Sequence, residues 1–327
     1  MILESYLEKK VIVMIDIIIP AYNAHETICE TLFSIAMQTM RDKINVYIID
    51  DCSKNDYSAE IKRFSSLLNI KEIKTPKNSG PGYARQLGID SSTSEFIVFI
   101  DSDDVFYNYK SIEILYNTIT DKYANVVSSK FIEEINDFIV PHKNDEIWMH
   151  GKIYRRKFLD ENNIRFNNTY SNEDTGFNNL IFLCTSVVNI DDITYIWRCN
   201  PKSITRSSEY NFWGMEGFTY NICWAVKGAE ERDANPCSIA TLLYETILEV
   251  YYRYVFYKKI RKDSDDVFKW SVELKKYYLK YYDYLDYYTK SESLYSIFTN
   301  LYLTLGFSED LFDNDISFNK FLDMISD

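Results

Sequence analysis

Short apolar runs, each ending at a proline or an acidic residue, set the pattern of the first hundred positions. Residues 15–19 are almost continuously β-branched and stop at Pro20, which cannot donate a hydrogen bond to a strand ladder. Similar runs follow at 45–50 and 95–100, with a weaker one at 69–74. Because continuous apolar runs of this length are typical of strands buried on both faces, we predict four strands of a parallel sheet, the first ending at Pro20.

The segments between these runs have helical spacing. Apolar residues recur every three or four positions over residues 26–40, and residues 57–68 and 83–89 also read as helices. Alternation of strand and helix implies right-handed crossovers and a mainly parallel sheet with helices on both faces. The predicted fold class of this part of the chain is therefore α/β.

The last third of the chain has a different pattern. Residues 239–260 and 267–288 show long apolar periodicity without glycine or proline, so we predict two long helices there. More than half of the chain's 28 tyrosines lie in this part. We divide the chain into an α/β domain over residues 1–208, with residues 1–13 as an extension, and a helical region over residues 209–327.

Polar and acidic residues follow three of the predicted strands. Tyr22 and Asn23 come after the first strand, Asp51 after the second, and Asp101 and Asp103 after the fourth. In sheets of this kind, ligands bind at the carboxyl ends of the strands. The sequence therefore predicts a site at this edge of the sheet.

The acidic loop Asp101-Ser102-Asp103 has two readings. Two carboxylates placed two residues apart suit a hard divalent cation such as Mg²⁺ or Mn²⁺, with substrate phosphates completing its shell. Aspartate is also frequent in solvated turns. The position directly after a buried strand, opposite Asp51, makes the metal site as well supported as the solvated turn, and both interpretations stay open.

A second acidic pair, Glu173-Asp174, precedes an apolar segment and is predicted to open a helix. Acidic residues favour a first helical turn because of the helix dipole alone. The functional alternative is a general base that accepts a proton from an acceptor hydroxyl.

The three histidines and six cysteines indicate no further site. His25, His142 and His150 fit no catalytic triad or metal-binding spacing and are expected to be structural, although His150 is placed to line a pocket. The cysteines show no Cys-x-x-Cys pair, so we expect reduced thiols and a cytoplasmic protein.

Composition narrows the class of protein. Of 327 residues, 46% are hydrophobic and 26% charged, which suits a globular protein rather than a disordered one. The net charge of −13 argues against nucleic acid and anionic membranes as partners. We find neither a signal peptide nor an apolar stretch long enough to span a membrane.

Six segments in order resemble the family 2 glycosyltransferases, which have a GT-A fold. The resemblance covers about residues 14–206 and rests on residues 19–23, 49–53, 78–88, 99–104, 152–156 and 172–175. It implies a GT-A, Rossmann-like mixed sheet, mainly parallel and flanked by helices, followed by the helical C-terminal region. It also implies a nucleotide-sugar donor, usually a UDP-sugar, and a divalent metal, Mn²⁺ or Mg²⁺.

The matched motifs imply the donor site. Tyr22 matches the residue that stacks on the base, Asp51 the carboxylate that accepts from the uracil imide, and Arg85 a residue of the donor pocket suited to a diphosphate. Asp103 matches the direct metal ligand and Asp101 a residue that contacts the ribose, or the metal through water. The remaining donor-site residues implied by the motifs are Pro20, Ala21, Asn23, Asn78, Gly80 and Ser102, with Arg198 and Ser203 in a segment that either closes over the phosphates or is a surface loop.

The resemblance also implies the reaction. Asp174 matches the catalytic base, and Glu173 supports it or faces the acceptor. One base and one displacement invert the anomeric centre. Because the sequence lacks the Gln-x-x-Arg-Trp motif of processive synthases, we expect a hexosyl- or N-acetylhexosaminyltransferase that adds a single sugar.

Several alternatives stay open. The expected acceptor is a cell-surface glycan or its precursor, with a polyol phosphate polymer, a protein or a modified nucleobase as other choices. A non-catalytic sugar-nucleotide binding module would have lost Asp103 or Asp174, and a nucleotidyltransferase would carry a glycine-rich loop after the first strand. The tyrosine-rich helices suit a hydrophobic core, an acceptor platform or an interface between copies of the chain.

Overall fold

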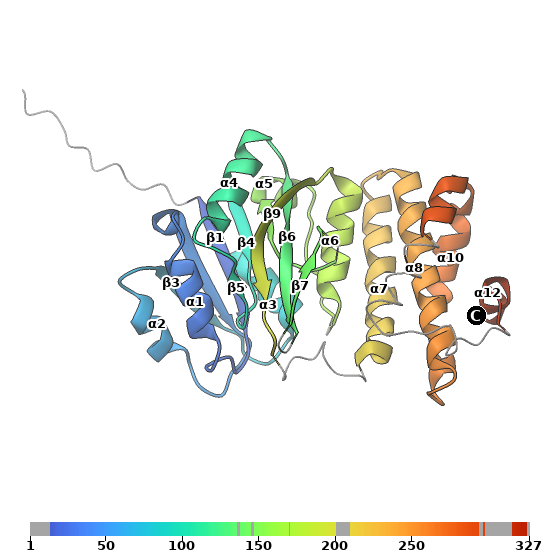
Figure 1. Cartoon of the computed structure of the whole chain (residues 1–327), viewed down its shortest axis with the longest axis horizontal. Coiled ribbons are helices and arrows are strands. Elements are labelled where there is room, and N and C mark those ends of the chain that lie inside the picture. Colours follow the sequence, from blue (N-terminus) through green and yellow to red (C-terminus); the bar gives the residue numbers. More distant parts are fainter. Residues whose placement is uncertain are drawn as a thin grey trace, which may run out of the picture. The chain divides into compact units, whose positions relative to one another are not determined.

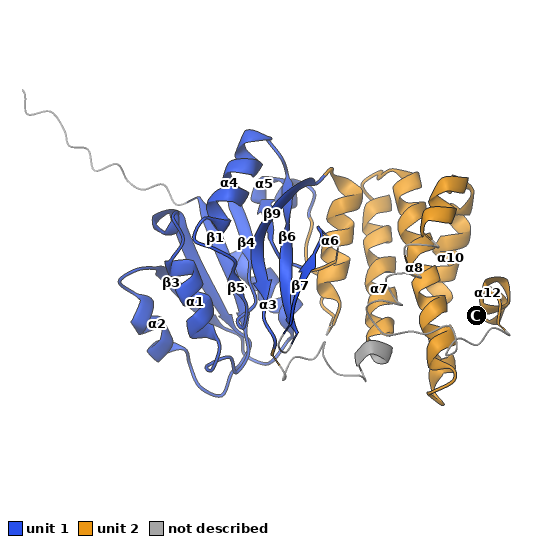
Figure 2. Ribbon diagram, in the orientation of Figure 1, with its two compact units in different colours: residues 1–145, 149–163, 187–199 blue, residues 146–148, 164–186, 200–327 orange. Residues whose placement is uncertain are grey.

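The structure is a computed structural model that describes residues 14–135, 138–144, 147–169, 171–200, 210–293, 297 and 316–325. The contacts between residues divide the chain into two compact units (Figure 2). Unit 1 comprises residues 1–145, 149–163 and 187–199, and unit 2 comprises residues 146–148, 164–186 and 200–327. Residues 164–186 thus group with the C-terminal helices, although they precede the boundary that we place at residue 208. The predicted extension 1–13 lies outside the described residues.

The first four strands of unit 1 form the predicted parallel sheet (Figure 1). They are β1 (Ile15–Ala21), β2 (Ile44–Asp50), β3 (Asn69–Lys74) and β4 (Phe96–Phe99), in the order β3-β2-β1-β4. The prediction that Pro20 ends the first strand is wrong. Pro20 lies opposite Ile49 in the ladder, and the next carbonyl, that of Ala21, accepts from the N–H of Asp51 at 2.8 Å. The ladder continues because proline removes only its own donor.

The other strands make the sheet mixed. In the described residues β4 is followed across the sheet by β8, β6, β9 and β5, while β7 pairs with β6 on one side. The pairs β4–β8, β6–β8, β6–β7 and β5–β9 are antiparallel, and β6–β9 is parallel. Their bounds are β5 (Val105–Phe106), β6 (Val126–Ile135), β7 (Phe138–His142), β8 (Lys152–Arg155) and β9 (Val188–Trp197). A mixed sheet flanked by helices confirms the predicted fold class.

The helices of unit 1 agree with the apolar periodicity, with shifted ends. They are α1 (Ile28–Ala36), α2 (Ser58–Phe64), α3 (Pro81–Ser91), α4 (Ser111–Asp121) and α5 (Arg156–Glu161), with a short 3₁₀ turn η1 (Arg41–Lys43). The predicted helices 26–40 and 57–68 are longer than α1 and α2. By contrast, α3 starts two residues before the predicted position 83, because proline suits the first helical turn.

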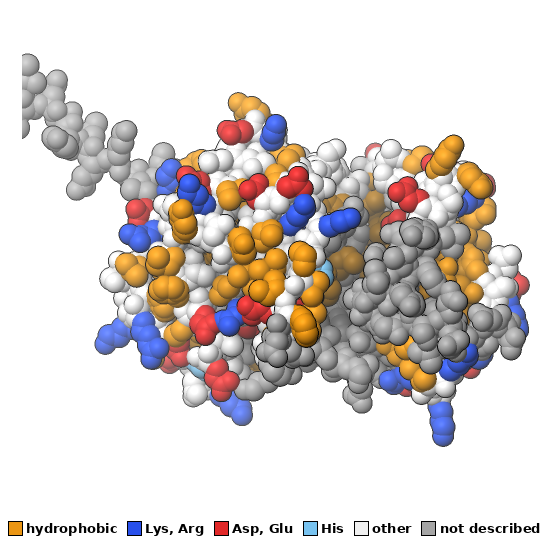
Figure 3. Space-filling model, in the orientation of Figure 1, with side chains coloured by type: hydrophobic (Ala, Val, Ile, Leu, Met, Phe, Trp, Pro, Cys, Tyr) orange, Lys and Arg blue, Asp and Glu red, His pale blue; other side chains and the backbone are white. Residues whose placement is uncertain are grey.

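β1 is the centre of the core of unit 1. Ile15, Ile17, Ile18 and Ile19 are all fully buried, so side chains cover both faces of the strand. α3 lies so close to this strand that a Cβ on Gly88 would come within 2.4 Å of Ile18 Cγ2. Only glycine permits this approach. On the face of unit 1 drawn in Figure 3, positively charged side chains lie among acidic and hydrophobic ones.

Unit 2 is helical in its described residues. Its longer helices pack in sequence, α6 against α7, α7 against α8, and α8 against α10. None of the described helices is both long and apolar enough to cross a membrane. The bounds are α6 (Glu173–Cys184), α7 (Tyr210–Glu230), α8 (Pro236–Tyr257), η3 (Ser264–Asp266), α9 (Val267–Trp270), α10 (Val272–Tyr281), η4 (Tyr282–Tyr284) and α12 (Phe318–Met324).

The prediction of one uninterrupted helix over residues 267–288 is wrong. Leu285 is extended and buried, which breaks the helix after η4. Asp286 then accepts from the N–H of Thr289 at 2.7 Å and so caps the next helical turn. Apolar periodicity continues through this break because the buried Leu285 keeps the apolar spacing, and the sequence pattern therefore does not reveal it.

The tyrosines of unit 2 divide between core and surface. Tyr254 is fully buried and lies against Phe268 and Phe321, with ring centroids 4.9 and 5.5 Å away. Tyr287 and Tyr288 are each 80% exposed. Part of the tyrosine enrichment therefore builds the helical core.

Candidate active site

The loops after β1 and β2 are fastened to each other at the carboxyl edge of the sheet. Asn23 is in the left-handed region, with φ of 51°, and its N–H donates to Ser53 Oγ at 2.8 Å. The next N–H, of Ala24, donates to the Tyr57 hydroxyl at 2.9 Å. Tyr22, between Ala21 and Asn23, remains 52% exposed. A fixed backbone with an exposed aromatic ring suits stacking on a planar base.

Asp51 fastens the next loop to the same edge. Its carboxylate is 4% exposed and accepts from the Gly80 N–H at 2.7 Å, from the Ser79 N–H at 2.9 Å and from the Thr75 hydroxyl at 2.9 Å. Gly80 has φ of 87° and directly precedes α3. Asn78, also predicted for the donor site, is exposed in this loop. The residue predicted to accept from uracil therefore also fixes the loop that carries Asn78 and Gly80.

Arg85 and Asp101, predicted as parts of the donor pocket and the metal loop, form an ion pair. Arg85 is 5% exposed, and its Nη2 donates to Asp101 Oδ1 at 2.7 Å. Burial by itself raises the pKa of Asp101, but the charge of Arg85, the electrostatic effect of His150 and the hydrogen bond from Arg85 outweigh it, so the pKa lies below its usual value. Asp101 is therefore held as a carboxylate at neutral pH.

Asp104 ties the acidic loop to β9. Its Oδ2 accepts from the Tyr195 hydroxyl at 2.6 Å, and its Oδ1 accepts from the Arg198 N–H at 2.8 Å. Burial and the nearby charges of Asp103 and Asp101 raise its pKa well above the ordinary value. Sequence reasoning did not assign Asp104 a role, although it stands directly beside Asp103.

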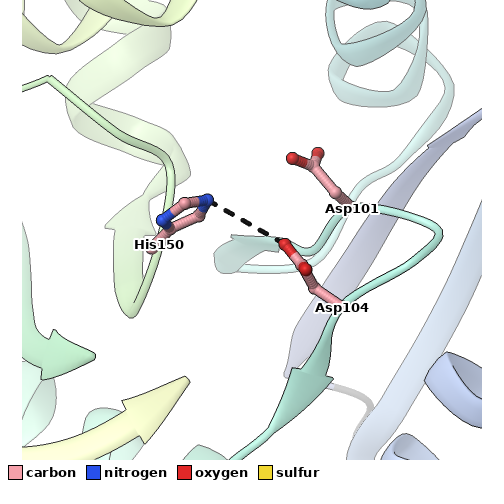
Figure 4. Close-up of side chains that lie close together, drawn as sticks. All are labelled: Asp101, Asp104 and His150. Atoms are coloured by element: carbon pink, nitrogen blue, oxygen red, sulfur yellow. Dashed lines mark ion pairs between the residues drawn. The ribbon is translucent and has the colours of Figure 1, made fainter. Parts of the chain in front are cut away.

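Asp101, Asp104 and His150 form the one group in the described residues with the composition and spacing of a metal site (Figure 4). One oxygen or nitrogen atom of each side chain lies within 4.8 Å of those of the other two, and His150 Nε2 lies 3.9 Å from Asp104 Oδ2. The imidazole is 4% exposed and stacks on Tyr195 at 4.6 Å. No spacing in the sequence joins His150 to the acidic loop, since the fold alone brings them together.

Asp103 and Ser102 are half-buried in the same loop, outside this three-residue group. The metal-ligand role of Asp103 therefore stays a prediction.

Arg198, predicted for a segment over the donor phosphates, is paired with acidic side chains of unit 1. Its guanidinium forms an ion pair with Glu30 of α1, and its Nε lies 3.3 Å from Glu134 of β6. Ser203 lies outside the described residues.

The second acidic pair lies in unit 2, where it opens α6 as predicted. Glu173 is buried at 4% exposure, whereas Asp174 is half-buried and accepts from the N–H of Thr175 at 2.8 Å. The free N–H groups of a first helical turn stabilise negative charge. Asp174 is thus the member of the pair that solvent can reach.

Comparison with known proteins identifies the family. A sequence model of the family described as "Glycosyl transferase family 2" matches residues 16–172. The poly(ribitol-phosphate) beta-N-acetylglucosaminyltransferase TarS of Staphylococcus aureus is 27% identical over 214 residues, which are 60% of this chain and 37% of TarS. The corresponding enzyme TarP of the same species is 29% identical over 150 residues, 45% of this chain and 44% of TarP. The chain thus spans less than half the length of these relatives.

Solved structures agree on the fold. The structure of S. aureus TarS residues 1–349 in complex with UDP-GlcNAc superposes with a TM-score of 0.70 at 19% identity, covering 89% of this chain and 92% of that one. A mannosyltransferase from Pyrobaculum calidifontis in complex with GDP-Man and Mn²⁺ has a TM-score of 0.50 at 13% identity, covering 88% and 86%. The family model and the ordered motifs identify residues 16–172, just under half of the chain, as a family 2 glycosyltransferase domain, and the mixed sheet and these likenesses agree on a GT-A fold.

Proposed function

We propose that this glycosyltransferase moves a single sugar from a UDP-sugar to a hydroxyl acceptor with inversion, and that Asp174 is the general base. The observation that carries the proposal is the contrast within the acidic pair, in which Asp174 is accessible at the start of α6 and Glu173 is buried. A base must reach the hydroxyl proton that it removes. Glu173 then supports the first turn of α6 rather than touching the acceptor.

The donor loops support a uridine nucleotide. Tyr22 is exposed beside the fixed backbone of Asn23, and Asp51 holds the loop that carries Asn78. UDP-GlcNAc is the first donor to test, because it is the ligand of the TarS structure with the same fold.

The donor atoms of the acidic loop fit a divalent cation. Two carboxylates and one imidazole within 4.8 Å of one another suit Mn²⁺, which accepts oxygen and nitrogen ligands. Asp101 and His150 would hold the ion with Asp104 beside them, and Asp103 remains the ligand that the sequence motif implies. A bound ion would neutralise negative charge on the leaving diphosphate.

A polyol phosphate polymer is the acceptor that the relatives favour. Two relatives, TarS and TarP, are named for transfer to poly(ribitol phosphate). A cell-surface glycan is the second candidate, because it is the default that the family resemblance implies.

The experiment measures UDP release from a panel of UDP-sugars with Mn²⁺, with and without poly(ribitol phosphate). We expect one donor to be consumed, acceptor to speed its turnover, and EDTA to stop it. Asp174→Asn should abolish transfer and leave UDP binding intact, whereas Asp90→Asn, an exposed carboxylate on α3, should have no effect. Full activity of Asp174→Asn would overturn the base assignment, and an equatorial anomeric proton in the product, as in the α-linked donor, would overturn inversion.

A further inference from the structure

Helix α7 holds the residues that lead directly into the acidic pair. Asn221 of α7 is fully buried, and its amide nitrogen lies 3.1 Å from the Ser171 carbonyl oxygen and 3.1 Å from Thr169 Oγ1. Its amide oxygen accepts from Asn167 Nδ2 at 3.2 Å. One side chain therefore fixes three positions within the seven residues before Asp174.

The turn itself is held by the same helix. Asn172, immediately before Glu173, is in the left-handed region with φ of 57°, and its Nδ2 donates to the Gly214 carbonyl at 3.0 Å. Positions 214, 217 and 221 lie on one face of α7, because a helix repeats every 3.6 residues. The side-chain amides of Asn221 on α7 and of Asn172 before α6 thus join this face of α7 to the start of α6.

Close packing restricts the conformations that the segment at the start of α6 can adopt. A Cβ on Gly217 would lie 2.6 Å from Ser171 Oγ and 3.0 Å from Asn172 Nδ2. On the other side, a Cβ on Gly176 would lie 2.7 Å from Asn221 Oδ1. Glycine at both positions lets the two helices approach at the level of the acidic pair.

A buried amide is a costly way to fill a core, because it must be hydrogen-bonded on all sides. Thr219, also buried on α7, satisfies its hydroxyl within the helix, by donating to the Met215 carbonyl at 2.9 Å. Asn221 also donates to the Gly217 carbonyl of its own helix at 2.9 Å, but its other hydrogen bonds go to the segment before the acidic pair. We infer that Asn221 is a positioning residue that, with Gly217, sets the place of the Asp174 carboxylate for proton abstraction, an inference that rests on the proposed role of Asp174.

Asn221→Asp tests this most sharply, because it keeps the shape and replaces the donor to Ser171 by an acceptor. With the UDP-sugar that the wild type turns over fastest, we expect kcat to fall about 10–100-fold, since small misplacements of a catalytic group have effects of this size. The KM for the donor and the affinity for UDP should change less than about twofold, because no donor-site residue is altered. Asn221→Ser, which is too short to reach Ser171, gives a second variant if Asn221→Asp does not fold.

Two matched controls lie on the same helix. Thr219→Val removes a buried hydroxyl that donates to carbonyls of its own helix, and it should keep kcat within about twofold. Gly217→Ala and Gly228→Ala gain the same helix propensity, but a Cβ on Gly228 meets only flexible side chains, nearest Leu180 Cδ1 at 3.0 Å. We expect Gly217→Ala to lower kcat and Gly228→Ala to leave it unchanged.

Amide hydrogen exchange of residues 171–176 gives a readout that needs no substrate. It should be faster in Asn221→Asp and unchanged in Thr219→Val. Unaltered exchange and kcat in folded Asn221→Asp, or an equal loss in Thr219→Val, would overturn the inference. If Asp174→Asn is inactive while the Asn221 variants keep their rate, only this inference fails. If Asp174→Asn keeps its rate, the proposed base fails first.

Discussion

The guanidinium of Arg85 donates to the carboxylate of Asp101 at 2.7 Å, and this contact joins the start of α3 to the acidic loop after β4. The Asp51 carboxylate holds the N-terminus of the same helix through the Gly80 N–H. α3 therefore connects two loops of the donor site. A change in either contact should affect both loops.

Arg85→Met should destabilise the protein and weaken donor binding together. Removing the cation leaves the Asp101 carboxylate, whose side chain is 33% exposed, without its close partner. We expect the free energy of unfolding to fall by about 1–3 kcal/mol, the usual effect of deleting one partner of a charged hydrogen bond that is at least partly buried. Urea unfolding and the KM for the UDP-sugar measure the two effects.

Arg85→Lys is the matched control for charge, and it should lose less because it keeps the cation but not the fork-shaped donor set. Equal stability of Arg85→Met and the wild type would show that the ion pair contributes nothing.

Asp51→Asn should reduce stability as well as donor affinity. The new amide would point a donor at the N–H of Ser79 or Gly80, both of which now donate to Asp51. Each buried N–H left without an acceptor costs about 1–3 kcal/mol. Thr75→Val removes a hydroxyl that donates to the same carboxylate but leaves both backbone N–H groups their acceptor, so it should have a smaller effect. If Asp51 only binds the uracil of the donor, Asp51→Asn will raise the KM for the UDP-sugar and leave unfolding in urea unchanged.

The parallel half of the sheet could be predicted because each of its strands is a short apolar run that is recognisable in the sequence by itself. The run Ile15–Ile19 is apolar throughout, and the structure buries its isoleucines on both faces of β1. α7 was not recognised as a separate helix, since glycines at 214, 217 and 228 interrupt its helical pattern. Two of these glycines have close tertiary neighbours, since a Cβ would lie 2.6 Å from Ser171 Oγ on Gly217 and 3.0 Å from Leu180 Cδ1 on Gly228. Helix propensity is judged from one segment alone, so it takes no account of the packing of another segment against it.

The candidate site residues that directly follow a strand could be predicted from the sequence. Those that the strand order brings together from distant segments could not. Asp51 and Asp101 follow apolar strands, so the topology alone gathers them at one edge. His150 comes from the segment before β8, and its place beside Asp104 depends on the order of β8, β6 and β9, which no local pattern determines. In the same way, Asp104 looks like one more loop acid until Tyr195 and Arg198 are seen to donate to it.

His150→Gln should weaken Mn²⁺ binding measured calorimetrically in the presence of UDP. Loss even of residues that only support metal ligands typically lowers metal affinity 10–100-fold, so we expect a loss of at least about tenfold. His142→Gln is the matched control, because His142 pairs with Glu133 at 2.8 Å and stacks on Phe131. Asp101→Asn should weaken binding as His150→Gln does. Identical Mn²⁺ affinity in His142→Gln and His150→Gln would exclude His150 as a ligand.

Stability should fall with rising pH above about pH 8.5, where an exposed thiol begins to ionise. Burial, with a smaller effect of the Glu273 charge, raises the pKa of the Cys223 thiol to about 12. Between these two values the unfolded chain releases a proton that the folded chain keeps, so the free energy of unfolding decreases as pH rises. Cys223→Ala should reduce the decline of melting temperature between pH 8 and 11. Cys237→Ala, at an exposed thiol, should leave the decline unchanged. The same slope in both variants would contradict the assignment to Cys223.

Asp16→Asn should reduce stability without altering the donor site, because Asp16 lies near the opposite end of β1. Asp16 is fully buried and accepts from the N–H groups of Thr93 and Ser94, at 2.9 and 2.6 Å, with Arg156 Nη2 at 3.4 Å. An amide at this position places a donor next to other donors. We therefore expect the free energy of unfolding to fall by about 1–3 kcal/mol for each N–H left without an acceptor.

Asp90→Asn, on the exposed face of α3, should shift the urea midpoint negligibly. Below the new melting temperature the KM for the UDP-sugar should match the wild type, because the carboxyl ends of the strands bind ligand while this end serves only the fold. A raised KM in a fully folded Asp16→Asn would refute this separation.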